Sequence, residues 1–389
     1  MASYFAGLFK FPVRFELVIM VSPISSRIYG TLPGGQSIEA WTLTGRGGLV
    51  LEVITLGGIV TRLLVPGHDG ILDDVVLGFN NLDSYVTRHP YFGAIAGRVA
   101  GRITGAAFTL DGTSYKLAPN EPPNHLHGGL TGFDKRVWKA SPAPRAGGAP
   151  ALRLIYLSPD GEEGYPGNLD VAVTYTVADE NAFIIETEAT IDRTTPLSLT
   201  HHSYFNLSGE SSGTIENHLL TIHSDQYVPV REDMTLSGRL ESAVQEPNDF
   251  RESRRLGDAL PQLFQRHGDL YALPDRTNNA PQLAARLEDP VSGRVMTVST
   301  TERYLQLYTG CHLDGSLTGK SGKPYSRFAG LCLECEGYPD ASNAAMRVHT
   351  LLQPGQTQRS TTSYTFSVCR PGESSQSPGN PGTNHPRYD

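Results

Sequence analysis

The chain of 389 residues contains no apolar run that approaches the roughly 18 residues of a transmembrane helix. The run Leu17–Val21 is shorter than the roughly seven residues of a signal-peptide core, and Arg14 and Glu16 interrupt the apolar residues before it. Four cysteines are also few for a secreted chain of this length. We therefore expect no membrane partner, and a cytoplasmic rather than a secreted protein.

Two of the four cysteines, Cys332 and Cys335, form a C-x-x-C pattern of the kind that occurs in redox proteins. Residues three apart on an extended strand are separated by about 10 Å, whereas Cα atoms joined by a disulfide lie within about 7 Å. We predict that this pair packs in the interior and takes no part in redox chemistry.

A basic surface is missing as well. The sequence has 32 Lys and Arg against 40 Asp and Glu, a formal net charge of −8, with no block of basic residues. Nucleic-acid-binding proteins present clustered Lys and Arg to the phosphates. We expect no nucleic-acid partner; a neutral small molecule suits this charge balance.

Long apolar stretches with the helical period are absent, while Gly (41) and Pro (27) are plentiful. Leu169–Val177 alternates in the manner of a strand, and Asp111-Gly112 and Ser292-Gly293 are typical of hairpin turns. Only two short helices are expected, at Asn80–Val86 and Asp249–Leu256. The pattern predicts an all-β fold, a large antiparallel β-sandwich of many strands.

No linker divides the middle of the chain, so one domain is expected over residues 26–369. Residues 1–25 form a predicted N-terminal extension. Residues 370–389 consist mainly of Pro, Gly, Ser and Asn and are predicted to be a disordered tail.

One carboxylate stands inside an apolar, strand-like run near the C-terminal end. Glu334 follows Leu333 and precedes Cys335, and the run ends at a Gly and Pro turn. A carboxylate that loses its hydration in such a place is suited to accept protons near neutral pH. The alternative is a Glu on an edge strand that faces water.

Three other polar segments offer partners for this carboxylate. His201 and His202 follow a strand-like stretch, and because side chains alternate along a strand only one of them can face a shared cleft. His127 precedes a glycine pair that lets the backbone approach a ligand, and Arg102 lies in a segment of small and apolar residues. An acid and base site is therefore predicted.

Together these segments resemble the aldose 1-epimerases, also called galactose mutarotases, from roughly Gly48 to Val368. The family's fold, a galactose mutarotase-like supersandwich, agrees with the predicted β-sandwich. Five motifs carry the resemblance in the family's order: Tyr91-Phe92-Gly93 with Gly97-Arg98 and Arg102-Ile103; Leu126-His127-Gly128-Gly129 with Gly132-Phe133-Asp134-Lys135; His202-Ser203-Tyr204-Phe205-Asn206-Leu207; Gln306-Leu307-Tyr308-Thr309-Gly310 with Leu313-Asp314-Gly315; and Leu331-Cys332-Leu333-Glu334 with Pro339-Asp340 and Asn343.

The resemblance implies that Glu334 is the general base and His202 the general acid of a cofactor-independent isomerase that acts on a free hexose such as galactose or glucose. The base takes the proton of the anomeric hydroxyl while the acid protonates the ring oxygen, which opens the ring. Ordinary pKa values near about 4.3 for Glu and about 6.5 for His suit these tasks. The resemblance also implies four sugar-binding residues: Arg102, His127, Asp269 and Gln306.

Two positions depart from the family pattern. Gly101 stands where the family usually has Asn, so an amide beside Arg102 is missing. The family's Asp-His-Asn segment matches His267–Leu273 only with a shift of one residue, which makes Asp269 the candidate there. These departures leave open a non-standard hemiacetal or lactol as substrate.

Three further alternatives concern function. His125 and His127 would share a face of an extended segment and, with His202 and Glu334, would form a three-nitrogen, one-carboxylate metal site; the resemblance implies no metal. Alternatively, a sugar-binding protein without turnover would use the strand face of Tyr304, Gln306 and Tyr308. A hexose-phosphate epimerase would need basic residues at the cleft, for which Arg98 and Arg102 are the visible candidates.

Overall fold

The structure is a computed structural model that describes residues 23–87, 89–143, 145–263, 268–275, 279–342, 345 and 349–369. Residues 1–22 of the predicted extension and the whole predicted tail lie outside these ranges, as do His267 and Asn343. The first described strand, β1, begins at Ile24.

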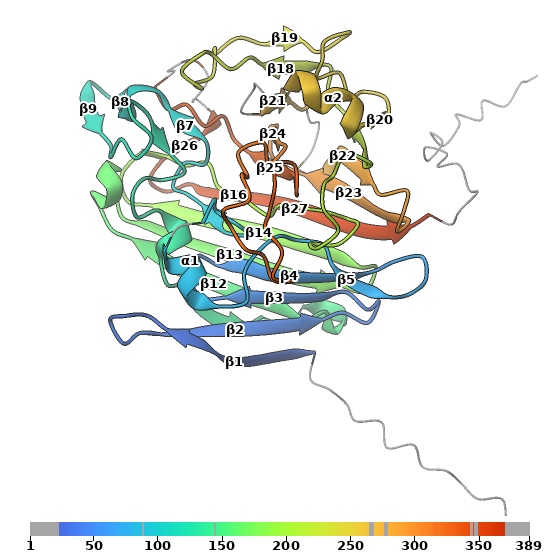
Figure 1. Cartoon of the computed structure of the whole chain (residues 1–389). Coiled ribbons are helices and arrows are strands. Elements are labelled where there is room, and N and C mark those ends of the chain that lie inside the picture. Colours follow the sequence, from blue (N-terminus) through green and yellow to red (C-terminus); the bar gives the residue numbers. More distant parts are fainter. Residues whose placement is uncertain are drawn as a thin grey trace, which may run out of the picture.

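The largest sheet has nine strands, and every neighbouring pair in it is antiparallel. Its long strands cross the middle of the molecule in Figure 1. In spatial order the strands are β11 (Lys139–Pro142), β12 (Ala151–Ser158), β13 (Leu169–Ala178), β14 (Ala182–Ile191), β27 (Thr357–Val368), β23 (Arg294–Thr300), β22 (Gln282–Glu288), β17 (Leu219–Ile222) and β20 (Arg254–Arg255).

Two five-stranded antiparallel sheets accompany it, one drawn near the bottom of Figure 1 and one near the top. The first contains β1 (Ile24–Thr31), β2 (Ser37–Thr44), β3 (Val50–Ile54), β4 (Ile59–Pro66) and β5 (Leu72–Asp74). The second contains β19 (Glu241–Ser242), β18 (Gln226–Val228), β21 (Asp269–Ala272), β24 (Tyr304–Tyr308) and β25 (Cys332–Glu336).

Short two-stranded ladders and a few helical turns connect the sheets. The ladders pair β7 (Arg102–Ile103) with β10 (His125–Leu126), β6 (Ile95–Ala96) with β16 (Thr200–His201), β8 (Ala107–Leu110) with β9 (Thr113–Lys116), and β15 (Thr195–Pro196) with β26 (Leu351–Leu352). The helices of the described residues are α1 (Leu82–Thr87), α2 (Leu256–Leu263) and four single 3₁₀ turns (Thr104–Ala106, Phe133–Lys135, Ala146–Gly148, Glu162–Gly164).

One apolar core joins the three large sheets. On β13, Val171, Val173, Tyr175 and Val177 all face it, as the alternation in the sequence predicts. Residues of β3 and β4 and of β24 and β25 belong to the same cluster. The predicted all-β antiparallel sandwich is confirmed, and β24 and β25 rest on its core with one face each.

The predicted local elements mostly match. Asp111 and Gly112 form the turn between β8 and β9, and both have positive φ, as a two-residue hairpin turn requires. The prediction of a helix over Asp249–Leu256 is wrong, because the Asp249 carboxylate accepts hydrogen bonds from Arg251 and from the backbone of Gln245 and holds a turn. The helix begins at Leu256 instead.

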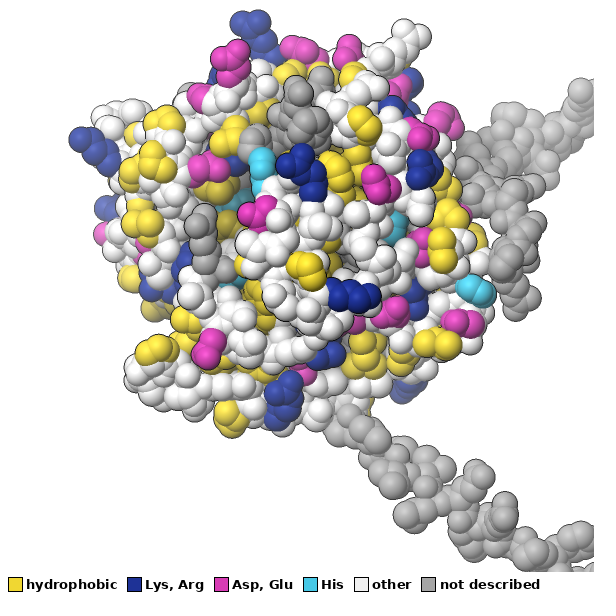
Figure 2. Space-filling view, in the orientation of Figure 1, with side chains coloured by type: hydrophobic (Ala, Val, Ile, Leu, Met, Phe, Trp, Pro, Cys, Tyr) yellow, Lys and Arg dark blue, Asp and Glu magenta, His cyan; other side chains and the backbone are white. Residues whose placement is uncertain are grey.

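The described residues contain no helix that is both long and apolar enough to cross a membrane. The face shown in Figure 2 carries acidic and basic side chains interspersed, without a large area of one sign.

Candidate active site

A cavity of about 880 Å³ is lined by β24, β25, the β7 strand and the segments that follow β10 and β16. This volume lies within the range of roughly 300–1,000 Å³ that is usual for small-molecule sites. The antiparallel register of β24 and β25 places Gln306 directly opposite Glu334, so both side chains stand on the face that lines the cavity.

Glu334 is only 2% exposed although it lines the cavity. Every residue of β25 is buried, although β25 is the last strand of its five-stranded sheet. Burial raises the pKa of Glu334 to about 8, and the positive charge of Arg102 opposes this shift. The predicted alternative is therefore right about the edge strand and wrong about the side chain, because Glu334 does not face water.

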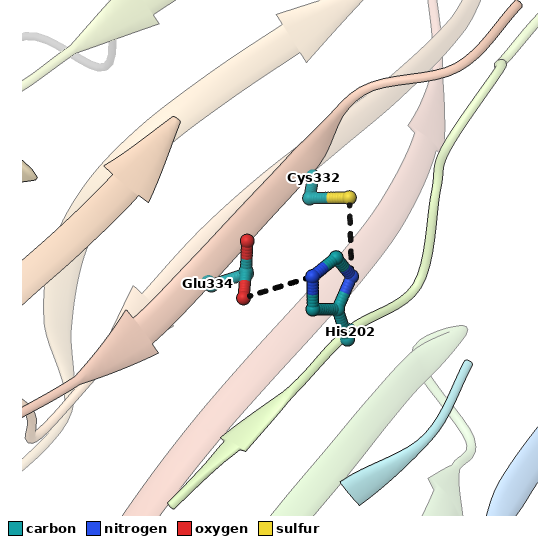
Figure 3. A group of neighbouring side chains, drawn as sticks. All are labelled: His202, Cys332 and Glu334. Carbon is teal, nitrogen blue, oxygen red and sulfur yellow. Dashed lines mark hydrogen bonds and ion pairs between the residues drawn. The ribbon is translucent and has the colours of Figure 1, made fainter. Parts of the chain in front are cut away.

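His202 faces this carboxylate across the cavity, with its Nε2 3.5 Å from Oε2 of Glu334 (Figure 3). Its backbone is held on both sides: the N–H of His202 donates to the carbonyl of Ala94, and its carbonyl accepts from the N–H of Gly93. The ring stacks against Tyr204 at a centroid distance of 5.2 Å. These contacts hold the imidazole in one orientation.

The second ring nitrogen of His202, Nδ1, lies 3.5 Å from the thiol sulfur of Cys332 (Figure 3). Burial and the neighbouring Glu334 raise the pKa of this thiol well above its usual value, so it remains protonated. A protonated thiol is a donor, and a hydrogen bond from it to Nδ1 leaves the proton of a neutral ring on Nε2. The nitrogen that faces Glu334 is thus the one that carries the proton.

Burial lowers the pKa of His202 to about 4, in the opposite direction to the shift of Glu334. Between these two pKa values the pair holds one exchangeable proton, which resides on Glu334 because its pKa is the higher of the two. An ionised Glu334 with a protonated His202 contains the same number of protons. The pair can therefore pass one proton between its members without uptake from solvent.

His127 contributes another imidazole to the cavity, with its ring centroid 5.1 Å from that of His202. Its Nδ1 accepts a hydrogen bond from the backbone N–H of Gly101, so a neutral ring carries its proton on Nε2. Burial lowers the pKa of His127 well below its usual value, and His202 and Arg102 add to the shift. The ring is therefore a neutral hydrogen-bond donor.

Arg102 reaches the same cavity from β7. Its Nε and Nη2 donate to the two carboxylate oxygens of Glu121 at 2.5 and 2.7 Å. This bidentate pair fixes the plane of the guanidinium. Arg98 differs: it is 2% exposed and donates to the side chain of Ser158 and to backbone carbonyls, so its charge holds loops together and does not line the cavity.

Gly101 is required by its own backbone. It has a φ of +74°, and a β-carbon at this position would lie 2.6 Å from Cβ of Pro339. The absence of an amide side chain at this position therefore follows from the local packing.

Asp269 does not line the cavity. It is the first residue of β21 and is 2% exposed, and the neighbouring Gly268 lines the cavity instead. Gly268 has a φ of +100°, and a β-carbon there would lie 2.4 Å from Nε2 of Gln306. The shift of one residue in the sequence match thus puts a glycine at the cavity, whereas Gln306, Arg102, His127, His202 and Glu334 converge there as predicted.

The two remaining candidate histidines point elsewhere. His201 hydrogen-bonds Ser203 and packs among the rings of Tyr175 and Phe183, on the opposite side of the strand from His202. His125 uses both ring nitrogens, one toward the carbonyl of Ala118 and one toward the hydroxyl of Tyr165.

The predicted sharing of one face by His125 and His127 is wrong, because His127 has a φ of +49° and the segment is not extended there. The metal set proposed from spacing is therefore not assembled. His202, Cys332 and Glu334 have ligand atoms within 4.8 Å of one another and can hold a metal ion only by giving up their hydrogen-bonded protons.

Sequence reasoning missed two residues that line the cavity, Tyr91 and Glu336, and the role of Cys332 beside it. Tyr91 stands 4.5 Å from the ring of His127 and 5.8 Å from that of His202. Cys332 was assigned to packing, yet it orients His202, and all four cysteines are free thiols. Glu336 lines the cavity two residues after Glu334, and strand alternation is the signal that predicts it on the same face.

Comparison with known proteins gives a consistent result. The family model described as Aldose 1-epimerase matches residues 39–365. Galactose mutarotase of Sus scrofa is 42% identical over 351 residues, which cover 90% of this chain and 100% of that protein. Aldose 1-epimerase of Escherichia coli (strain K12) is 32% identical over 341 residues, covering 86% and 96% respectively. The solved structure of the GalM/aldose epimerase homologue from C. elegans matches with a TM-score of 0.78 at 28% identity, covering 85% and 98%.

The antiparallel sandwich and its similarity to these structures place the chain among the galactose mutarotase-like folds. The chain belongs to the aldose 1-epimerase family, and it is an isomerase.

Proposed function

We propose that this enzyme interconverts the α and β anomers of a free hexose such as galactose or glucose, with Glu334 as the general base and His202 as the general acid. The observation that carries this assignment is the 3.5 Å contact between Nε2 of His202 and the buried carboxylate of Glu334 in a cavity large enough to admit a hexose. Relatives named galactose mutarotase and aldose 1-epimerase along nearly the whole chain support the same reaction.

The reaction begins from the form in which Glu334 is ionised and His202 is protonated. Glu334 removes the proton of the anomeric hydroxyl while Nε2 of His202 donates its proton to the ring oxygen, and the bond between the anomeric carbon and that oxygen breaks. The proton now resides on Glu334, and the neutral ring of His202 keeps its other proton on Nδ1, with the sulfur of Cys332 as the acceptor at this stage. Rotation about one carbon–carbon bond and the reverse transfers close the ring as the other anomer.

The remaining cavity residues bind the sugar. His127 presents an N–H, Arg102 presents a guanidinium fixed by Glu121, and Gln306 presents an amide opposite Glu334. Donors of this kind stabilise the oxygen on which negative charge develops. Asp269 is not included, because Gly268 occupies its expected place in the cavity.

The direct test is the rate at which freshly dissolved α-D-galactose and α-D-glucose change optical rotation, measured for the wild type and for Glu334→Gln with a chelator present. The wild type is expected to accelerate the change, whereas Glu334→Gln lacks the base and is expected to have lost activity by at least about 100-fold. Glu188→Gln, on β14 and paired with Arg359, is a matched control away from the cavity. Full activity of Glu334→Gln would refute the assignment.

A sugar-binding protein without turnover is separated by the same variants. Glu334→Gln preserves the shape of the side chain, so it is expected to bind the sugar measurably by calorimetry while turnover is lost. Wild-type protein that binds galactose but leaves the rate of mutarotation unchanged would establish the binding function instead.

A phosphorylated substrate is disfavoured by the charges at the cavity. Arg98 is absent from the lining, Arg102 is paired with Glu121, and Lys135 is paired with Asp134 at 3.0 Å. A neutral sugar fits this environment, and we propose a cytoplasmic enzyme without membrane or nucleic-acid partners.

A further inference from the structure

A second carboxyl group lines the cavity beside the proposed base. Glu336 follows Glu334 by two residues on β25, so both side chains project from the same face of the strand with their Cα atoms about 7 Å apart. The catalytic assignment does not use this group.

Glu336 is 2% exposed, yet part of its polar surface is unsatisfied. Within the described part of the chain, Oε2 is buried and has no hydrogen-bond partner. The other oxygen, Oε1, lies 3.7 Å from the position that a β-carbon on Gly101 would take. The carboxyl group therefore stands beside the backbone of Gly101, next to the ring of Pro339.

Among the residues that the structure describes, no Lys, Arg or His forms an ion pair with this group. Burial is the largest influence on Glu336, and the two charged neighbours that act on it, Glu334 and Glu302, are both acidic. All three raise the pKa of Glu336 well above its usual value. A protonated carboxyl group has one donor and at least one acceptor. It can therefore both donate to and accept from a sugar hydroxyl.

We propose that Glu336 is a substrate-binding residue whose carboxyl group forms hydrogen bonds with one ring hydroxyl of the sugar and thereby contributes to the choice of hexose. A buried oxygen without a hydrogen bond destabilises the protein, and a ligand that supplies the missing partner removes this cost and so binds more tightly. Sugars that present a hydroxyl at this point satisfy Oε2, whereas sugars that lack it leave the oxygen unpaired. The spacing along β25 lets Glu334 and Glu336 contact different oxygens of the same ring.

This inference rests on the proposed function, since it assumes a sugar bound against Glu334. The test compares kcat and KM of the wild type, Glu336→Gln and Glu336→Leu on galactose and on a set of monodeoxy galactoses, each lacking one hydroxyl. The wild type is expected to lose about 10-fold in kcat/KM on one deoxy sugar, the worth of one hydrogen bond. Glu336→Leu is expected to process galactose about 10-fold less efficiently, mainly through KM, and to lose the discrimination against that one sugar.

Glu336→Gln is the conservative variant, because an amide keeps a donor and an acceptor in a similar shape. It is expected to retain the discrimination that Glu336→Leu loses. A melting temperature of Glu336→Leu equal to or above that of the wild type would accompany this result, because leucine removes an unsatisfied buried oxygen. A structural role for the carboxyl predicts the reverse: a lower melting temperature and equal losses on every sugar.

Three outcomes overturn the proposal: equal losses on all sugars, retained discrimination in Glu336→Leu, or lost discrimination in Glu336→Gln. If Glu336→Leu does not fold, the result for Glu336→Gln decides alone. Glu188→Leu serves as the matched control and is expected to behave as the wild type on every sugar. Glu334→Gln is measured alongside: if it is active, the proposed function fails, whereas if it is inactive and the sugars are not discriminated through Glu336, only this inference fails.

Discussion

Cys332 and His202 illustrate how single residues determine where protons reside in this cavity. The thiol lies at Nδ1, the nitrogen that does not face Glu334, and its raised pKa keeps it a donor. Burial alone shifts the pKa values of Glu334 and His202 in opposite directions, because it disfavours the charged form of each. Glu334 and His202 thus share one exchangeable proton, and Cys332 helps to determine which nitrogen of His202 transfers it.

Replacement of Cys332 tests the first of these roles. Cys332→Ala removes the donor at Nδ1 and lets the other tautomer of His202 form, so kcat is expected to fall by about 10-fold. Cys332→Ser keeps an O–H donor and is expected to retain more activity than Cys332→Ala. Cys335→Ala is the control, since Cys335 packs in the core, and it is expected to lower the melting temperature with kcat retained. Equal kcat in Cys332→Ala and the wild type would contradict the tautomer argument.

Replacement of the adjacent histidines is expected to affect different properties: His202 activity and His201 stability. His202→Ala removes the acid and is expected to lower kcat by at least about 100-fold. His201→Ala leaves a cavity among Tyr175 and Phe183, so it is expected to reduce the free energy of unfolding by about 1–3 kcal/mol with a much smaller change in kcat. Steady-state kinetics and urea unfolding of both variants measure this, and the opposite order would mean that His201 faces the sugar.

The pH dependence of kcat/KM follows from the proton count of the pair. Below a pH of about 4 both Glu334 and His202 are protonated, and above about 8 neither is, so activity is expected to decline beyond both limits. Arg102, His127 and Glu336 line the same cavity, and Cys332 contacts His202, so the measured pH profile includes the effects of these groups on the pair. A rate that keeps rising above pH 9 would show that the pair does not need its proton.

At the level of elements, two features bring the cavity together. The pairing of β24 with β25 aligns Gln306 with Glu334, and the ladder of β7 with β10 places Arg102 opposite Leu126, next to His127. The turn at Gly101 joins the two, since its N–H holds His127 while Pro339, beyond β25, packs against its α-carbon. The geometry of the binding residues therefore depends on this turn.

Gly101→Ala is expected to disturb the turn in two ways, through positive φ and through contact with Pro339. Gly105→Ala isolates the first effect, because Gly105 has a φ of +64° and a β-carbon there would contact nothing within 4 Å. Both variants are expected to lose about 1–2 kcal/mol of unfolding free energy from the backbone, and Gly101→Ala more. Only Gly101→Ala is expected to raise KM, because it moves His127 and Arg102; equal KM values would refute this.

At the scale of the whole molecule, burial of Glu334 and His202 makes the folding stability of the protein depend on pH. Glu334 has an ordinary pKa of 4.5 and a folded-state pKa of about 8. A raised carboxyl pKa contributes stability that is complete below 4.5 and is lost as the pH rises toward 8. His202 contributes in the opposite sense: its stability is present above 6.5 and is lost as the pH falls toward 4.

Glu334→Gln removes the first of these contributions and leaves the second. The melting temperature of the variant minus that of the wild type is therefore expected to increase as the pH rises from 5 to 8.5. Scanning calorimetry across this range measures the difference, with Glu188→Gln as the exposed control that shows no such trend. A difference that is constant with pH would mean that Glu334 is not desolvated in the folded state.

A chelator is expected to leave activity unchanged, because the proposed proton transfers require no metal. Because His202, Cys332 and Glu334 can hold a metal ion only by releasing protons, added Zn²⁺ is expected to inhibit, and less so in Cys332→Ala relative to that variant's own rate. Loss of activity with chelator and its return with Zn²⁺ would reverse this assignment.

The sequence by itself was enough to predict local structure. Alternation along Leu169–Val177 and the Asp111-Gly112 turn follow from steric preferences of short segments, and the same alternation separates His201 from His202. The motif around Glu334 indicated a site because an acid within an apolar run is costly unless it is used. These inferences require only the nearest neighbours in the chain.

The remaining features depend on contacts between residues far apart in sequence. Burial that raises the pKa of Glu334 requires β24 and the core to cover β25, and the proton on Nε2 of His202 requires Cys332, 130 positions away. Gly268 replaces Asp269 in the cavity because the backbone enters β21 with positive φ, which no alternation pattern reveals. Solvation and hydrogen-bond partners are properties of the packed chain, so they were settled only when the three sheets came together.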